Sequence, residues 1–126
     1  MIQRIQTLYI ILGAILHFFP WQWDNEFPYS LFIILLGTLL VLVTIFSYNS
    51  RQRQVTILYL MIAMVLIPIF ESSLIIVSTT PWVPMPTKLL GILMLISQIL
   101  AVIFYILAIK SIKKDDDLIK SIDRIR

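Results

Sequence analysis

The chain has 126 residues, of which 60% are hydrophobic and 13% charged, and its mean hydropathy is +0.95. Soluble domains contain about 25% charged residues, so a soluble fold of this length could not hide so much apolar surface. The absence of cysteine excludes disulfides and thiol chemistry, and a single histidine excludes a histidine metal cluster, so we expect no metal and no cofactor.

The first apolar segment covers about residues 3–20, and its uninterrupted apolar run is Leu8 to Phe19, with Arg4 near its start. A helix that crosses a bilayer needs about 20 mostly apolar residues. A cleaved signal peptide is the alternative interpretation. The run from Phe18 to Trp21 lacks the small residues of a cleavage site, so we expect the segment to be retained.

Three further segments have the length and composition of membrane-spanning helices, at about 27–48, 55–77 and 89–110. The third segment contains Pro68 and Glu71, and the fourth contains Ser97 and Gln98. A proline-rich stretch separates these two segments. We therefore expect an all-α integral membrane protein of one domain, residues 1–126, whose four spans form an antiparallel up-down bundle.

The basic residues indicate how the spans are oriented. Nine of the ten, namely Arg4, Arg51, Arg53, Lys110, Lys113, Lys114, Lys120, Arg124 and Arg126, fall in regions that four crossings put on one side. Positive residues collect on the cytoplasmic side of a membrane. We expect a multi-pass protein of the bacterial inner membrane with both termini in the cytoplasm. Basic residues that flank spans form no patch for nucleic acid.

Small and polar residues at helical spacing mark the faces where membrane helices pack, because lipid tails are as apolar as leucine. The sequence offers three such sets: Gly37 with Thr44, Tyr59 with Ala63, and Ser97 with Ala101 and Ala108.

Glu71, His17 and Gln98 are the candidate polar site within the predicted spans. A carboxylate in the hydrocarbon region is costly unless it is paired, protonated or hydrated. Glu71 and His17 fall at comparable depths, so they could meet in a proton-linked or ligand-binding site. The alternative is structural: Glu71 reaches the outer interface beside Pro68, and Gln98 bonds another helix.

The last residues, 113–126, form a predicted short amphipathic helix, because Leu118, Ile122 and Ile125 recur at the period of one helical face. This helix would lie on the inner leaflet or dock on a protein. The candidate contact residues of the cytoplasmic face, for a partner or for lipid, are Arg4, Arg51, Arg53, Leu118, Lys120, Ile122, Arg124, Ile125 and Arg126.

Three stretches resemble one known family along the whole chain: Met1 to Tyr9, the turn Arg51 to Gln54, and the ending Lys114 to Arg126. The ending is the most specific. It matches the pattern Lys-acidic-acidic-x-Leu-(Val/Ile)-basic-Ser-x-Asp-Arg-(Leu/Ile)-Arg, in which x is any residue. The family comprises small four-helix inner-membrane proteins of Bacteroidota, catalogued only as a domain of unknown function. The resemblance implies topology and location, and no activity.

The sequence favours a non-enzymatic accessory or scaffold protein of the inner membrane. In this interpretation its partners are membrane lipids and a protein bound at the cytoplasmic face or in the membrane. The alternative is a small carrier or ligand-binding bundle that uses Glu71, His17 and Gln98. A membrane enzyme ranks third, because one histidine and no paired acidic residues within the spans leave few groups for catalysis.

Overall fold

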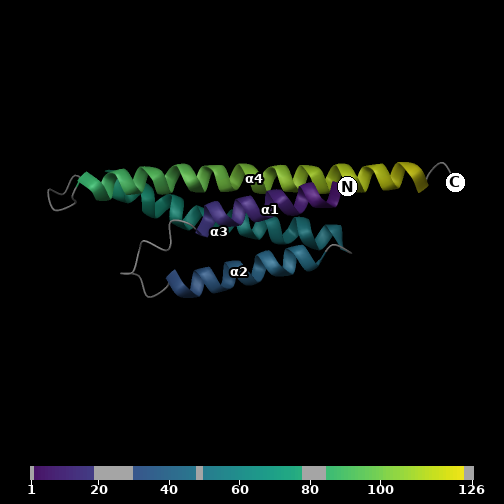
Figure 1. Cartoon of the computed structure of the whole chain (residues 1–126), viewed down its shortest axis with the longest axis horizontal. Coiled ribbons are helices and arrows are strands. Elements are labelled where there is room, and N and C mark those ends of the chain that lie inside the picture. Colours follow the sequence, from purple (N-terminus) through teal and green to yellow (C-terminus); the bar gives the residue numbers. More distant parts are fainter. Residues whose placement is uncertain (1, 19–29, 48–49, 78–84, 124–126) are drawn as a thin grey trace.

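The computed structural model describes residues 2–18, 30–47, 50–77 and 85–123. These residues form four α-helices and no strand: α1 (Ile2–Phe18), α2 (Ser30–Phe46), α3 (Arg51–Val77) and α4 (Met85–Asp123). Successive helices run in opposite directions along one long axis, so the start of α1, the end of α2, the start of α3 and the end of α4 share one end of the bundle (Figure 1). The prediction of an all-α, antiparallel four-helix architecture is confirmed.

Helix α4 organises the bundle, since both α1 and α3 pack along it extensively whereas α2 makes a smaller contact with α1 and α3. The centre of the packing is Tyr105, which is fully buried and lies against the backbone of Gly13. A Cβ atom at Gly13 would come within 2.6 Å of the Tyr105 ring, so glycine is what allows α1 to approach α4 this closely. Ile10, Leu58 and Ala101 belong to the same core.

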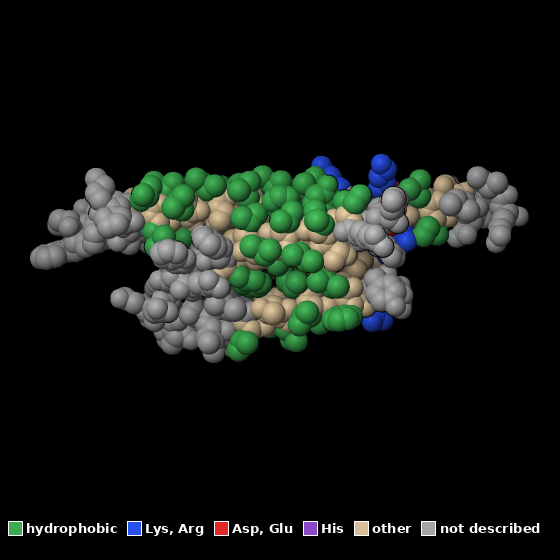
Figure 2. Space-filling view, viewed as in Figure 1, with side chains coloured by type: hydrophobic (Ala, Val, Ile, Leu, Met, Phe, Trp, Pro, Cys, Tyr) green, Lys and Arg blue, Asp and Glu red, His purple; other side chains and the backbone are tan. Residues whose placement is uncertain are grey.

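Besides this apolar core, the bundle buries polar side chains and exposes large apolar ones to an extent unusual for a soluble protein. Among the described side chains, seven polar ones are buried: Gln6, His17, Thr44, Gln54, Ser72, Ser97 and Gln98. Meanwhile large aliphatic and aromatic side chains on every helix point outward, including Leu8, Leu39, Phe70 and Ile103. In Figure 2 hydrophobic side chains cover much of the visible face, and the lysines and arginines lie toward one end. Soluble monomers rarely expose apolar patches of more than a few hundred Å².

Two of the three predicted packing faces are confirmed. Ser97, Ala101 and Ala108 are buried along α4, as are Gly37 and Thr44 along α2. The ring of Phe18 lies where a Cβ of Gly37 would be. The prediction for Tyr59 and Ala63 is wrong, because both side chains are exposed. The buried face of α3 instead carries Leu58, Met61, Val65 and Ser72.

The predicted separate C-terminal helix is also wrong. Residues 113–123 continue α4 without a break, so that α4 has 39 residues and a length of about 58 Å. The reason is local: the change from apolar to charged residues after Ile112 brings no glycine or proline, so nothing ends the helix. We call residues 113–123 the extension. It runs past the first residues of α1 and α3 (Figure 1).

Other helix bounds differ from the predicted spans by a few residues. Helix α3 begins at Arg51 rather than 55, and α4 begins at Met85 rather than 89. Pro86 thus lies in the first turn of α4, where its missing N–H costs no hydrogen bond.

Two stretches of the described residues are long and apolar enough to cross a membrane by length and composition, Arg51–Leu74 and Leu89–Ser121. Their most apolar windows are only 28% and 33% buried, whereas the core helix of a soluble protein is mostly buried. The described apolar parts of α1 and α2, Ile5–Phe18 and Leu35–Phe46, are shorter. Membrane association is therefore indicated, by two helices.

Candidate functional site

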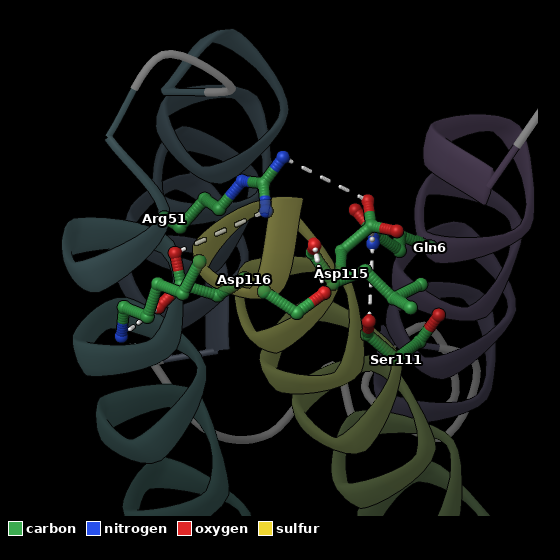
Figure 3. A network of polar contacts seen from close by, with 8 residues as sticks. Gln6, Arg51, Ser111, Asp115 and Asp116 are labelled. Atoms are coloured by element: carbon green, nitrogen blue, oxygen red, sulfur yellow. Dashed lines mark hydrogen bonds and ion pairs between the residues drawn. The ribbon is translucent and has the colours of Figure 1, made fainter. Parts of the chain in front are cut away.

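A network of polar side chains joins three helices at the end of the bundle where the extension begins (Figure 3). The buried side chain of Gln6 on α1 donates two hydrogen bonds to α4. One reaches the Ser111 carbonyl oxygen at 3.3 Å, and the other reaches a carboxylate oxygen of Asp115 at 3.1 Å. Both donors of the Gln6 amide are thereby used. The base of the extension is fixed to α1.

Arg51, the first residue of α3, faces two carboxylates of the extension (Figure 3). Its guanidinium nitrogens lie 4.0 Å from Asp115 and 3.9 Å from Asp116. These distances are too long for hydrogen bonds, so the contacts are electrostatic. One guanidinium nitrogen, Nη1, is buried and has no hydrogen-bond partner among the described residues. Arg51 therefore holds the extension and still has donors to spare.

Asp116 pairs with Lys120 one turn later in α4, at 2.6 Å. This hydrogen bond is the main cause that lowers the pKa of Asp116 below its ordinary value, and the positive charges of Lys120 and Arg51 add to the effect. Partial removal from water raises the pKa of Asp116, but the net shift is downward. Asp116 is consequently ionised at neutral pH, as the ion pairs require.

Two hollows flank this network. A cavity of about 200 Å³ is lined by Gln6, Ile10, Ile45, Gln54 and Asp115, among others, and Arg51 borders it. An open groove of about 760 Å³ runs between the start of α3 and the extension. Residues Ser50 to Gln52 and Val55 form one wall of this α3–α4 groove, and the other carries Ile112, Lys113, Asp116, Asp117, Ile119 and Lys120.

Gln54 joins α3 to α2 at the same end of the bundle. Its buried side chain donates a 2.9 Å hydrogen bond to the carbonyl oxygen of Thr44. Thr44 lies in the last turn of α2, where carbonyl groups lack partners within the helix. On the outside of the bundle, the Lys113 ammonium lies 3.3 Å from the hydroxyl of Tyr59 and 5.8 Å from its ring centre.

Only some of the candidate contact residues predicted for the cytoplasmic face lie close together in the structure. Arg51 and Lys120 line the α3–α4 groove, while Arg53 and Leu118 are exposed nearby. Arg4 and Ile122 belong to helices, but their side chains are outside the described part. Arg124, Ile125 and Arg126 lie outside the described residues.

The candidate polar site of the predicted spans is partly assembled. His17 and Gln98 are both buried and joined by two hydrogen bonds. Gln98 Nε2 donates to the His17 carbonyl oxygen at 3.1 Å, so Gln98 Oε1 is the acceptor that lies 2.9 Å from the ring Nδ1. That nitrogen must therefore carry the proton. His17 stands in the last turn of α1, and Gln98 thus closes the end of that helix, as the structural alternative predicted.

Glu71 is partly buried on α3. The pairs Arg51–Asp116 and Tyr59–Lys113 set the antiparallel register of α3 and α4. Followed along both helices, this register puts the turn with Glu71 at about the level of Gln98. One residue on, the buried Ser72 hydroxyl donates to the Pro68 carbonyl oxygen. His17, Gln98 and Glu71 thus share one level of the bundle, and the contact established for His17 is with Gln98.

Sequence reasoning missed the residues that join the helices at this end of the bundle. It assigned no contact between helices to Gln6, Gln54, Asp115 or Asp116, which lie in the stretches that resemble a family. Gln6 falls on the buried face of α1 with Ile10 and His17, and such a glutamine among apolar residues was the available signal. Across the described chain, no three side chains of the His, Cys, Asp and Glu types gather where they could hold a metal ion.

The site thus consists of a charged groove, an exposed helical extension and a buried amide–imidazole pair. No curated protein and no solved structure matches the chain. A family model described as "Domain of unknown function (DUF4293)" matches residues 21–125, which is most of the chain and includes the extension. The chain belongs to this family of unknown function.

Proposed function

We propose that this protein crosses the bacterial inner membrane four times, with the extension in the cytoplasm, and is a non-enzymatic accessory protein that binds a partner protein through the extension. The carrying observation is that α4 leaves the bundle as a continuous helix with Leu118 and Ile119 about half exposed, at 45% and 46%. The family match supplies no activity that competes with this proposal.

The membrane part of the proposal is supported by the buried polar residues and the exposed aliphatic ones. In hydrocarbon, Leu and Ile side chains gain no free energy by burial inside the protein. Polar side chains such as Gln98 and His17 do need hydrogen-bond partners there, and these two bond each other. The orientation rests on the nine basic residues assigned to one side. Because the chain has no cysteine, single cysteines at Asn25, Thr87 and Ser121 give a clean test. The first two should react with an impermeant reagent in intact cells, and Ser121 should not.

The partner-binding part is supported by where Leu118 and Ile119 lie. They follow three aspartates, beyond the level at which Arg51 and Asp115 close the bundle, so lipid tails do not cover them. A rigid helix with exposed aliphatic side chains is a common docking element for a groove on another protein. The ion pairs of Arg51 hold the base of the extension in place and reduce the entropy lost on docking.

The test compares two double variants of the full chain. Leu118→Ala with Ile119→Ala shortens the extension's apolar side chains, and Ile103→Ala with Ile106→Ala removes similar exposed surface from the proposed lipid-facing belt. Both proteins should insert in the membrane. A complex isolated in mild detergent at fixed stoichiometry should be lost only from the first variant. Equal recovery of the complex from both variants contradicts the proposal.

A carrier or ligand-binding bundle is the second candidate, favoured by the buried His17–Gln98 pair at the level of Glu71. Its readout is proton flux into proteoliposomes that contain a pH-sensitive dye. Under this proposal the wild-type protein carries a proton flux, and Glu71→Gln abolishes it. If proteoliposomes with the wild-type protein show no more flux than protein-free liposomes, the carrier proposal is excluded.

A further inference from the structure

The α3–α4 groove carries charges of both signs together with apolar residues. Arg51, Lys113 and Lys120 are cationic, and Asp116 and Asp117 are anionic. Val55, Ile112 and Ile119 supply apolar surface beside them. On both helices the groove lies where the apolar run meets the first charged residues. In a spanning protein that boundary is the level of the lipid headgroups.

Neither a simple anion nor a simple cation matches this groove. A lone phosphate near Arg51 would also meet the carboxylates of Asp116 and Asp117, and a lone ammonium near Asp117 would meet Lys113 and Lys120. A molecule with a phosphate and an ammonium a few ångströms apart satisfies both sets of charges. Electrostatic complementarity of this kind provides selectivity more than raw affinity.

Arg51 supplies the donors that such a phosphate needs. Its contacts with Asp115 and Asp116, at 4.0 and 3.9 Å, are too long to consume its N–H groups. The buried Nη1 has no hydrogen-bond partner in the described part of the chain. Buried donors without partners are rare, and a ligand oxygen is one way to satisfy them. Guanidinium groups bind phosphate through two parallel hydrogen bonds.

We propose that the α3–α4 groove binds the headgroup of a phospholipid with a primary ammonium, a phosphoethanolamine group, with its phosphate at Arg51 and Lys113 and its ammonium at Asp117. The lipid source is favoured over a soluble phosphoethanolamine ester because Val55 and Ile112 offer apolar surface to the adjoining glycerol and acyl chains. This proposal rests on the proposed membrane-spanning topology. Ile119 lines the groove and also belongs to the proposed partner-binding surface, so the two proposals are separated by their readouts, lipid bound to the isolated protein and recovery of a protein complex.

The test is native mass spectrometry of the full chain released from nanodiscs of defined lipid. The lipids are phosphatidylethanolamine, its N-trimethylated analogue phosphatidylcholine, and anionic phosphatidylglycerol. We expect phosphatidylethanolamine to bind about tenfold more tightly than phosphatidylcholine, because a trimethylammonium donates no hydrogen bond to a carboxylate. Asp117→Asn should bring that ratio close to one. Tighter binding of phosphatidylglycerol than of phosphatidylethanolamine overturns the proposal.

Lys113 and Lys114 provide the matched control. Lys113 lines the groove, whereas Lys114 lies outside it on α4 and borders a different hollow. Lys113→Gln should weaken binding of phosphatidylethanolamine and phosphatidylcholine alike, and Lys114→Gln should leave both unchanged. Equal effects of the two substitutions mean non-specific attraction and overturn the proposal.

A soluble competitor separates the two sources of the headgroup. Glycerophosphoethanolamine added to the detergent-solubilised protein should fail to displace the lipid at equal concentration. Displacement at equal concentration assigns the groove to a soluble ester and overturns the lipid source. Failure of the proposed topology is seen separately, as labelling at Ser121, and failure of partner binding is seen in the Leu118 and Ile119 variant.

Discussion

Gln98 binds His17 at two points, its ring Nδ1 at 2.9 Å and its carbonyl oxygen at 3.1 Å, and so ties the last turn of α1 to the middle of α4. Both residues are almost completely buried, at 2% and 0% exposure. One amide therefore satisfies a ring N–H and a helix-end carbonyl that have no access to water. The pair therefore stabilises the contact between α1 and α4, and we call it the clamp.

Gln98→Leu should destabilise the bundle, because it leaves the ring N–H and the carbonyl of His17 buried without partners. Each such group costs about 1–3 kcal/mol. The measurement is the free energy of unfolding in detergent micelles. The double variant His17→Phe with Gln98→Leu should recover part of the loss, since it removes the ring N–H but leaves the backbone carbonyl of residue 17 without a partner. A single variant as stable as wild type contradicts the clamp.

Gly13→Ala should destabilise the packing of α1 on α4, because its Cβ would lie 2.6 Å from the fully buried ring of Tyr105. The sign of the change in unfolding free energy shows whether a clash occurs, because without a clash alanine in place of glycine stabilises a helix by about 1 kcal/mol. In a Tyr105→Leu background the same substitution should therefore become neutral or stabilising. Thermal unfolding of the four proteins in this cycle measures the coupling. Loss of stability from Gly13→Ala in both backgrounds would show that Tyr105 is not the cause.

The continuity of α4 predicts a distance. Cysteines introduced at Lys110 and Ser121 on the cysteine-free chain stand eleven residues apart, so their Cα atoms should lie about 17 Å apart along one helix. Spin labels at the two sites should give a narrow distribution near that value by double electron–electron resonance. A broad or much shorter distribution would indicate a break between the span and the extension.

The sequence predicts the four helices well because each needs only a run of apolar residues. It also predicts the burial of Ser97, Ala101 and Ala108, since small side chains at helical spacing favour close packing. The choice of Tyr59 and Ala63 failed for a physical reason. A helix that is apolar all round has no polar face to orient it, so a tyrosine and an alanine four residues apart do not by themselves identify the contact face.

The candidate site was harder to predict, because its contacts join residues far apart in the sequence. Gln6 and Asp115 meet only after α1 and α4 have taken one particular register, and local patterns carry no information about that register. The extension was predicted as a separate helix because charged residues predominate from Lys113 onward. Lysine is a good helix former, and a change of polarity does not by itself end a helix.

Acid should loosen the extension, and the pKa of Asp116 sets the pH at which this happens. Lys120 and Arg51 lower the pKa of Asp116 in the folded protein, so its contribution to stability is complete above the unfolded value, about 3.9. That contribution is lost as the pH falls through the lower folded value. Spin labels at Arg53 and Ser121 should thus report a fixed distance from pH 7 to about pH 5 and a broadened distribution at still lower pH.

Two substitutions distinguish the contribution of Asp116 from that of Asp117. Asp116→Asn removes the charge that Arg51 and Lys120 face, so it should broaden the label distance at pH 7 and weaken the response to acid. Asp117→Asn removes an equal charge one residue on and should leave both the distance and the acid response close to those of the unsubstituted chain. If Asp117→Asn broadens the distance as much as Asp116→Asn does, net charge rather than the Asp116 ion pairs holds the extension.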